Sequence, residues 1–277
     1  MKKLSLLAIF LLVSCAEEVK EINAEQLVVR QGISYEVNSN TPFTGSTVEY
    51  YENGQVKKRR NYKNGIYHDL FEIYFENGQL KDKGFYKNNK LDGLYEYYSE
   101  EGFLLGRTSY KDGLGQGIYE EYWEDSGLLK FRGNMKNDNW DGLYESFHEN
   151  GQLAETGNYV DGKKEGLVEG YYENGQVKFR DNYENNLTNG SYERFWSNGQ
   201  LQSKGNAVND KADGYWKSFT KDGKLANTTL WKNGDEIESQ KTEYYQQFED
   251  EILCDAYPKL EKCGNWKITT KNFWFRL

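Results

Sequence analysis

The chain has 277 residues, with 28 glycines, only 2 prolines, and 23 Tyr, 14 Phe and 7 Trp. So many aromatic residues exclude a disordered chain, and so many glycines exclude a helical bundle. The formal net charge of −9 argues against nucleic-acid binding, which needs a basic face. Abundant glycine and tyrosine favour short strands joined by tight turns.

Residues 1–14 have the pattern of a secretory signal peptide. A positive start precedes an apolar run over residues 4–13, which is too short to span a bilayer. The run ends in Leu12-Val13-Ser14-Cys15, which resembles the lipobox of bacterial lipoproteins. That resemblance implies that Cys15 is lipidated and becomes the first residue of the mature chain. The alternative is an ordinary signal peptide that contains an incidental cysteine.

Lipidation would fix where the protein is found. We expect export and a lipid anchor in a bacterial membrane, on its periplasmic or external side, with residues 15–26 as a linker. Ala16 resembles the outer-membrane sorting choice of lipoproteins. Membrane contact is expected through the N-terminal lipid only.

Residues 45–234 consist of a repeat of 24 residues, with one extra residue near Asp125 and Ser126. The turn glycines that mark it are Gly54, Gly78, Gly102, Gly127, Gly151, Gly175, Gly199 and Gly223. A second set keeps the same period, with Asp69 replacing one member: Gly45, Gly93, Gly117, Gly142, Gly166, Gly190 and Gly214. Such spacing is the signature of a stacked repeat architecture.

Each repeat is predicted to be a β-hairpin. Its turn reads Glu76-Asn77-Gly78-Gln79 in a clear copy, and Asn-Gly suits the positive φ angles of a type I′ turn. Hairpins are joined by turns such as Lys63-Asn64-Gly65. The sequence therefore predicts an all-β fold: a single elongated antiparallel β-meander of about eight hairpins, preceded by lead-in strands over 27–44.

A two-residue turn sets a register that the sequence itself can test. It puts an aromatic residue opposite a glycine four times, as if each ring covered bare backbone: Phe71 and Gly84, Tyr119 and Gly133, Tyr144 and Gly157, Tyr192 and Gly205. This aromatic face, with a leucine column such as Leu80 and Leu153, is the expected core. On the other face, an aromatic column and a glutamate column are expected, with lysine stems over the rings: Lys57, Lys81, Lys130 and Lys178.

The second face supplies the candidate binding residues, which are Tyr74, Tyr98, Tyr122 and Tyr171 with Glu96, Glu120, Glu145 and Glu169. Rows of tyrosine are good anchors for a protein partner, and the carboxylates favour a basic one. Tyrosine rows can also stack on sugar rings, so a glycan is the alternative ligand. Catalysis is not expected, because carboxylates that recur in every hairpin form a stripe rather than one catalytic pair. No cofactor or metal site is predicted.

The repeat resembles a known family. Its pattern is Gly-x-Tyr-Glu-x-Tyr-x-x-Asn-Gly-Gln-Leu-Lys, then Tyr-Lys-Asn-Gly-Lys-x-Asp-Gly, and it resembles the variant MORN repeat over roughly 27–234. The lead-in, Arg30-Gln31-Gly32-Ile33-Ser34-Tyr35 and then Pro42-Phe43-Thr44-Gly45, looks like that of the YwqK-type antitoxin family. The resemblance implies a scaffold that binds a protein in the cell envelope, in its sharper form an antitoxin that neutralises a basic toxin domain.

Periodicity ends after Gly234, and residues 235–277 are expected to cap the last hairpin. Between Glu236 and Leu253, apolar residues spaced four apart indicate an amphipathic helix, which caps the sheet or binds a partner. Cys254 and Cys263 are candidates for a disulfide in an exported protein. The alternative is two reduced thiols.

Overall fold

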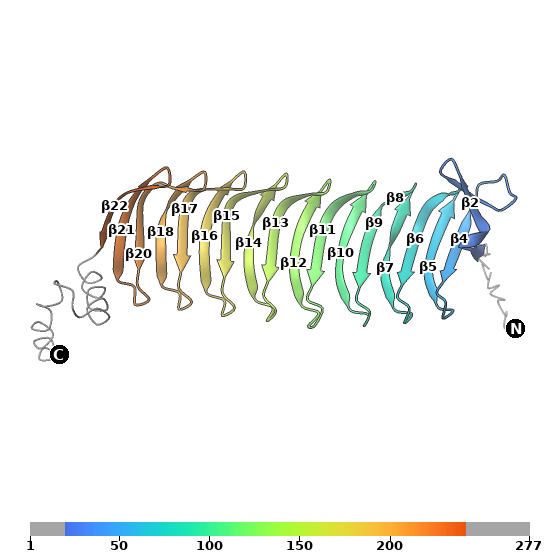
Figure 1. Ribbon diagram of the computed structural model, residues 1–277, viewed down its shortest axis with the longest axis horizontal. Helices are drawn as coiled ribbons and strands as arrows, with labels where there is room; N and C mark the ends of the chain where they lie inside the picture. Colours follow the sequence, from blue (N-terminus) through green and yellow to red (C-terminus); the bar gives the residue numbers. More distant parts are fainter. Residues whose placement is uncertain (1–19, 242–277) are drawn as a thin grey trace, which may run out of the picture. The chain divides into compact units, whose positions relative to one another are not determined.

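The computed structural model describes residues 20–241 (Figure 1). The chain divides into two compact units, unit 1 up to Gly102 and unit 2 from Phe103, and each is described by itself. Apart from one short 3-10 helix, η1 (Ala24–Gln26), the regular elements of residues 20–241 are strands. None of the described residues lies in a helix that is long and apolar enough to cross a membrane.

Unit 1 is an antiparallel meander whose strands pair in chain order. Its strands are β4 (Gly45–Tyr50), β5 (Val56–Lys63), β6 (Ile66–Tyr74), β7 (Leu80–Lys87), β8 (Lys90–Leu91) and β9 (Gly93–Tyr98). The lead-in forms a separate hairpin of β2 (Leu27–Arg30) and β3 (Ile33–Glu36). Strand β1 (Glu21–Asn23) was not predicted; it lies in the expected linker and pairs parallel with β4.

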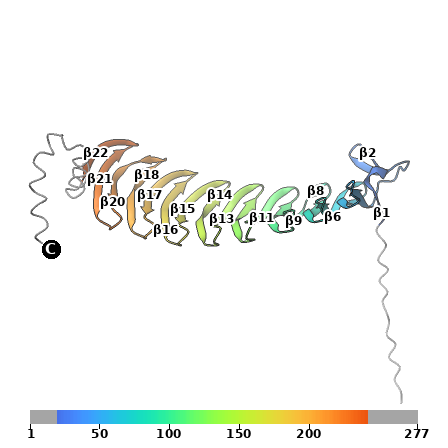
Figure 2. The same ribbon diagram turned by 60° about the horizontal axis from the view of Figure 1, so that its bottom comes forward.

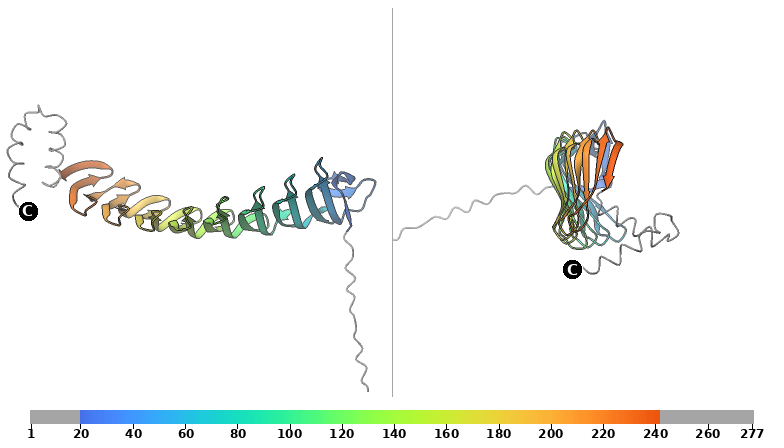
Figure 3. Two further views of the ribbon diagram at one scale, coloured as in Figure 1. Left: turned by 90° about the horizontal axis from the view of Figure 1, so that it is seen from below. Right: turned by 90° about the vertical axis from the view of Figure 1, so that its left-hand side faces the viewer.

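Unit 2 continues the same design as a single layer of bowed strands (Figures 2 and 3). Its strands are β10 (Leu104–Lys111), β11 (Leu114–Tyr122), β12 (Leu129–Lys136), β13 (Asn139–Phe147), β14 (Leu153–Val160), β15 (Lys163–Tyr171), β16 (Val177–Glu184), β17 (Leu187–Phe195), β18 (Leu201–Val208), β19 (Lys211–Ala212), β20 (Gly214–Phe219), β21 (Leu225–Lys232) and β22 (Asp235–Lys241). The predicted all-β antiparallel meander is confirmed in both units.

The segment after Gly234 begins differently from the expectation. Asn233 and Gly234 have φ angles of 53° and 89°, which form one more tight link, and β22 then pairs antiparallel with β21. The helix expected from Glu236 therefore does not begin there. The remainder of the predicted cap, with Cys254 and Cys263, lies outside the described residues, as do the predicted signal peptide and Cys15.

The hairpin turns are not of the predicted type. In the first of them, Gly54 has a φ of 82°, whereas Asn53 keeps a negative φ. The Gly54 N–H donates to the Tyr51 carbonyl at 3.0 Å, and the Tyr51 N–H donates to the Gln55 carbonyl at 2.8 Å. This geometry is a type I turn followed by a left-handed glycine, in a three-residue loop. Type I′ angles occur in the links instead, as at Asn64 with a φ of 53°.

The predicted register is nevertheless confirmed, because a β-bulge compensates for the longer loop. Tyr74 lies opposite Leu80, but Ile73 lies opposite Asp82, so one residue of β7 is skipped. Beyond the bulge the four predicted pairs are in place: Phe71 with Gly84, Tyr119 with Gly133, Tyr144 with Gly157 and Tyr192 with Gly205.

The second glycine set marks another bulge, beside the links. Gly166 has a φ of 77°, and Asp69, which replaces a glycine in this set, has a φ of 66°. Aspartate is among the few residues that tolerate this conformation. The residues of the second set therefore recur at this period because the backbone at each of their positions has a positive φ.

Both long edges of unit 2 are held together by ladders of hydrogen bonds. Asn174 Oδ1 accepts the N–H of Gln176 in its own turn at 3.1 Å, and its Nδ2 donates to the Ser197 carbonyl in the next turn at 2.8 Å. At the link edge the Thr188 N–H donates to Asp210 Oδ1 at 2.6 Å, and the Asp210 N–H donates to the Thr188 carbonyl at 3.0 Å. Repeats whose turn has this asparagine, such as those of Asn150, Asn174 and Asn198, are therefore bonded to their successors at the turn edge as well as at the link edge.

Replacing Asn174 with alanine should lower the free energy of unfolding by about 1–2 kcal/mol, because two hydrogen bonds are lost together. Chemical denaturation of the two proteins measures the difference. Glu173→Ala changes an exposed residue of the same turn and is expected to stay within about 0.5 kcal/mol of the unmodified chain. Equal losses of unfolding free energy in both variants would show that the hydrogen bonds of the Asn174 side chain do not stabilise the fold.

The face that carries the predicted aromatic pairs is the inner face, and it holds the core. Tyr144 is 4% exposed and Val168 is fully buried. A Cβ atom on Gly157 would lie 2.9 Å from both side chains, so the glycine leaves the space that they fill. The covering ring differs from the expectation at Gly133 and Gly205, over which Trp140 and Trp216 lie in place of Tyr119 and Tyr192.

One repeat has a charge in this glycine column. Asp181 takes the position that Gly157 and Gly205 hold in the neighbouring repeats, and it is 3% exposed. Arg194 binds it through two nitrogen–oxygen contacts of 2.5 and 2.8 Å. The guanidinium carbon lies 3.8 Å from the centroid of the Tyr192 ring. The acid is thus paired with a cation that is itself stacked on the core.

Candidate functional site

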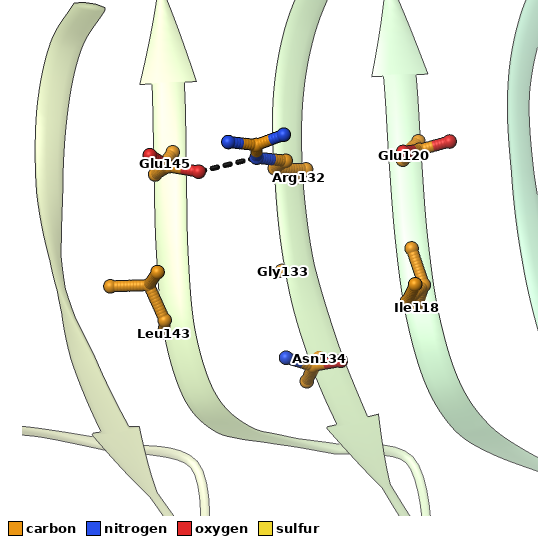
Figure 4. Close-up of a pocket in the computed structure, with 7 residues that line it drawn as sticks. All are labelled: Ile118, Glu120, Arg132, Gly133, Asn134, Leu143 and Glu145. Atoms are coloured by element: carbon orange, nitrogen blue, oxygen red, sulfur yellow. Dashed lines mark hydrogen bonds and ion pairs between the residues drawn. The ribbon is translucent and has the colours of Figure 1, made fainter.

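Three rows of side chains cross the outer face of unit 2. The aromatic row comprises Tyr122, Phe147, Tyr171, Phe195 and Phe219, each opposite a leucine or valine of the next strand. The charged row runs Arg107, Glu120, Arg132, Glu145, Thr156, Glu169, Arg180, Glu193, Lys204 and Lys217. The aliphatic row includes Ile118, Leu143 and Leu167, with Ser191 and Tyr215 in the corresponding places of later repeats. Figure 4 shows the last two rows side by side across β11, β12 and β13.

The leucine column lies in a different place from the prediction. Leu153, for example, is the register partner of Phe147, and paired residues of antiparallel strands project from the same face. The bulge after each turn causes this change, because it interrupts the alternation of faces on which the prediction relied. The outer face is consequently more apolar than expected.

The lysines that were expected to cover the outer aromatic column also lie elsewhere. Lys57, Lys81, Lys130 and Lys178 have their ammonium groups 5.0–5.8 Å from the ring centroids of Tyr51, Phe75, Trp123 and Tyr172, one residue after the outer column. The outer rings are covered by arginines of the charged row: Arg132 lies over Phe147 at 5.8 Å and Arg180 over Phe195 at 5.5 Å.

From Arg107 to Arg180 the charged row is neutralised by ion pairs rather than acidic. Arg107 Nε lies 2.5 Å from Glu120 Oε2, and Arg180 Nε lies 2.8 Å from Glu169 Oε1. Arg132 forms the same kind of ion pair with Glu145 (Figure 4). The sequence suggested an acidic stripe because these cations lie on the partner strand, 11 or 13 residues from their glutamates.

The structure brings together the predicted tyrosines and glutamates of each strand. In unit 2, the Tyr122 hydroxyl donates to Glu120 Oε2 at 2.9 Å, and the Tyr171 hydroxyl donates to Glu169 Oε2 at 3.2 Å. In unit 1, the Tyr98 hydroxyl donates to Glu96 Oε2 at 3.1 Å.

The remaining predicted residues follow the pattern less closely. Tyr74 is also in unit 1, where burial and a hydrogen bond with Glu72 raise the pKa of its phenol. Glu145 has Phe147 as its neighbour two residues on and therefore accepts no such phenol bond. The predicted residues thus form two groups, one in each unit.

The aliphatic row is a feature of the outer face that was not predicted. Ile118, Leu143 and Leu167 are 58%, 55% and 47% exposed, a large exposure for apolar residues that recur in register. Between Ile118 and Leu143 the outer face has a hollow of about 250 Å³ over Gly133 (Figure 4). The signal was present, since each of these residues lies two positions before a glutamate of the charged row.

Glu120 is the carboxylate of this row whose ionisation the structure shifts. Partial burial would raise its pKa, but hydrogen bonds from Arg107 and Tyr122 outweigh burial and lower the pKa below its usual value. Burial and the bond to Glu120 raise the pKa of Tyr122. Both effects favour one protonation state, a carboxylate that accepts from a neutral phenol.

Because Glu120 has a lower pKa when folded than when unfolded, its ionised form stabilises the fold. That contribution is present above the unfolded pKa of about 4.3 and is lost as the pH falls through the folded pKa. The melting temperature should therefore fall less steeply on acidification in Glu120→Gln than in the unmodified chain. Thermal melts between about pH 3 and pH 7 measure this, with Glu149→Gln, a change at an exposed turn, as the control. Parallel curves for Glu120→Gln and the unmodified chain would contradict the assignment.

Comparison with known families agrees with the repeat structure. Residues 43–64, 70–88, 140–161, 164–185, 188–209 and 212–233 match the MORN repeat variant. The chain carries MORN repeats. Residues 89–139 lie between two matched segments, and they contain the turns at Gly102 and Gly127, which lack the Asn-Gly-Gln present in five of the six matched segments.

Solved structures and curated proteins add little. A crystal structure of a GtfA/B complex bound to UDP and GlcNAc is similar over 54% of this chain and 25% of that one, with 12% identity and a TM-score of 0.15. A crystal structure of TcdB2-TccC3-Cdc42 is similar over 70% of this chain and 13% of that one, with 14% identity and a TM-score of 0.20. Likenesses this weak support no inference about the function of these MORN repeats. No curated protein matches the chain.

The MORN repeats offer no cluster of metal ligands within residues 20–241, where no three His, Cys, Asp or Glu side chains are placed to hold an ion. His148 illustrates how such residues are used. Its Nε2 donates to the Tyr171 carbonyl at 3.0 Å, as the Tyr172 hydroxyl does to the Phe195 carbonyl at 2.7 Å. His148 therefore takes the place of the tyrosine or tryptophan that other repeats have at this position.

Proposed function

We propose that this protein is a non-catalytic scaffold that binds another protein through the outer face of unit 2. The observation that supports the proposal is the exposure of Ile118, Leu143 and Leu167 in a row parallel to the aromatic row. Regularly spaced apolar side chains rimmed by polar groups are typical of protein-binding surfaces. MORN repeats, like other stacked repeats, offer an extended face for such contact.

The carboxylates that favour a basic partner lie at the turn edge rather than in the charged row. Glu124, Asp125, Glu149 and Glu173 are exposed on successive turns and have no ion pair among residues 20–241. A partner that lies across the outer face and has basic groups at its rim would find these carboxylates uncompensated. This arrangement supports a basic protein partner, although not through the glutamates that the sequence suggested.

In its sharper form the proposal is an antitoxin that neutralises a basic toxin domain by covering it. The resemblance of the lead-in to the YwqK-type family supports this form, and the lipobox ending at Cys15 supports a lipid-anchored position in the bacterial envelope. Binding alone suffices for neutralisation, so no catalytic residue is required.

The test is an in-cell crosslink and pull-down with two matched variants. Ile118→Glu with Leu143→Glu puts charges into the aliphatic row, and recovery of the partner should fall about tenfold or more. Val160→Glu with Val208→Glu changes two exposed residues, 47% and 41% accessible, at the ends of β14 and β18, and should leave recovery unchanged. Equal recovery with both variants would show that the outer face is not the contact. A partner of toxin-like character would support the antitoxin form.

A further inference from the structure

The alternation of charge along the outer face fails at one place. Lys204 of β18 lies directly opposite Lys217 of β20 and opposite Glu193 of β17 on its other side. The earlier cations Arg132 and Arg180 each face a glutamate on both sides. Like charges directly opposite each other on neighbouring strands are destabilising. Within residues 20–241 neither ammonium group has a carboxylate within ion-pair distance. The fold therefore holds two adjacent cations, neither of which is in an ion pair within these residues.

These lysines line a hollow of about 370 Å³. Gly205 and Gly214 contribute to its lining, and Tyr215, which is 66% exposed, stands beside them. The hollow corresponds to the one over Gly133, but its lining is different. Ser191 and Tyr215 replace the aliphatic residues Ile118 and Leu143. MORN repeats thus form the same depression twice, once with apolar walls and once with a ring, a hydroxyl and two cations.

Two carboxylates also line this hollow. Asp213 Oδ2 accepts the N–H of Asn233 at 3.2 Å. Glu193 lies between Arg180 and Lys204 in the register, and its charge contributes to the raised pKa of Arg180. Among residues 20–241, however, its carboxylate forms no ion pair with either, since Arg180 is paired with Glu169. The hollow therefore has two carboxylates at its sides, of which Asp213 accepts a hydrogen bond, and two ammonium groups between them that form no ion pair among residues 20–241.

We propose that this hollow binds an acidic saccharide residue, with its carboxylate between Lys204 and Lys217 and one face of the sugar ring on Tyr215. Its volume is within the range of small-ligand sites, and Ser191 and Asn206 supply hydroxyl and amide groups for sugar hydroxyls. An apolar side chain of a protein partner would bind more favourably against aliphatic walls, which this hollow lacks. The site is separate from the aliphatic row, so it stands or fails independently of the protein-binding function.

Calorimetric titration of the full-length chain in detergent tests the proposal, with a trisaccharide that contains one hexuronate as the probe. We expect the free acid to bind and its methyl ester to bind about tenfold more weakly or not at all, since the ester cannot form charge-assisted bonds. Lys204→Gln with Lys217→Gln should remove the difference between acid and ester. Lys211→Gln with Lys232→Gln, which changes two exposed lysines elsewhere, should preserve it.

Three results would overturn the proposal. The first is equal binding of the acid and the ester, which would mean that the lysines do not read the carboxylate. The second is unchanged binding in Tyr215→Ala, which would remove the ring from the site. The third is the absence of saccharide binding while a glutamate-rich peptide binds the unmodified chain and not the double lysine variant. Loss of protein partners in the Ile118 and Leu143 variant, with saccharide binding intact, separates this site from the proposed function.

Discussion

Replacing Gly157 with valine is expected to lower the free energy of unfolding of unit 2 by about 3 kcal/mol. A Cβ atom at this position would lie 2.9 Å from the Tyr144 ring and 2.9 Å from a Val168 methyl. Both side chains are buried, and both belong to neighbouring strands, so neither can move without breaking the sheet. Denaturation followed by tryptophan fluorescence measures the loss.

The matched control is Thr108→Val, in the same column of the inner face. Thr108 is 5% exposed, and its Oγ1 has no hydrogen-bond partner among residues 20–241. Valine keeps the shape and removes the unsatisfied hydroxyl, so stability should be unchanged or rise by about 1 kcal/mol. A loss at Thr108→Val as large as that at Gly157→Val would show that the loss does not depend on the space that Tyr144 and Val168 fill, and the account of Gly157 would be wrong.

The second large effect is expected at Asp181. Alanine at this position leaves the Arg194 guanidinium among aromatic rings without its counter-charge, and breaking a buried ion pair in this way costs about 3–5 kcal/mol. The Arg194 side chain retains 27% exposure, which lets water solvate part of the charge and places the expected loss near the lower value. The midpoint of denaturation measures it.

A double replacement distinguishes the ion pair from simple packing. Asp181→Gly with Arg194→Ser copies Gly205 and Ser218, the residues that the next repeat has in these positions. Because neither charge remains, we expect the double variant to be more stable than Asp181→Ala by about 1–2 kcal/mol. A double variant that is less stable than the single one would show that the pair itself contributes net stability.

The register could be predicted because the repeat gives it redundantly. Four aromatic residues faced glycines under a two-residue turn, and the structure has those pairs. The turn type was wrong because Glu-Asn-Gly-Gln suits both a type I′ turn and the longer loop that Gly54 closes with its left-handed φ. The loop and the bulge beside Tyr74 cancel in the residue count, so the sequence cannot distinguish the two.

The features that the sequence did not reveal depend on neighbours across the sheet. Bulges change the face of Leu153 and the ring that Lys130 covers, and no alternation rule anticipates them. The neutralisation of Glu120 by Arg107 requires the register of β10 and β11. β22 was missed because Asp235–Lys241 is too polar to read as a strand, and pairing with β21 determines its conformation. The candidate tyrosines were placed correctly beside their glutamates, but the exposed aliphatic row was overlooked.

The ladders along the two edges restrict how such a protein can change its length. Every Asn-Gly-Gln turn is bonded to the turn that follows it in the next repeat, so a residue gained or lost inside a strand would misalign every later rung. The one extra residue, near Asp125 and Ser126, is at the tip of a turn. There the indole N–H of Trp123 has no partner among residues 20–241, whereas that of Trp196 donates to the Phe219 carbonyl at 3.2 Å.

A lineage of such proteins can therefore grow or shrink most easily by duplicating or deleting whole 24-residue blocks. Each block adds two strands, or about 10 Å of face, and repeats every row of the outer surface at the same spacing. The length of the face offered to a partner would then change in fixed increments. The residues that line each added hollow could diverge independently.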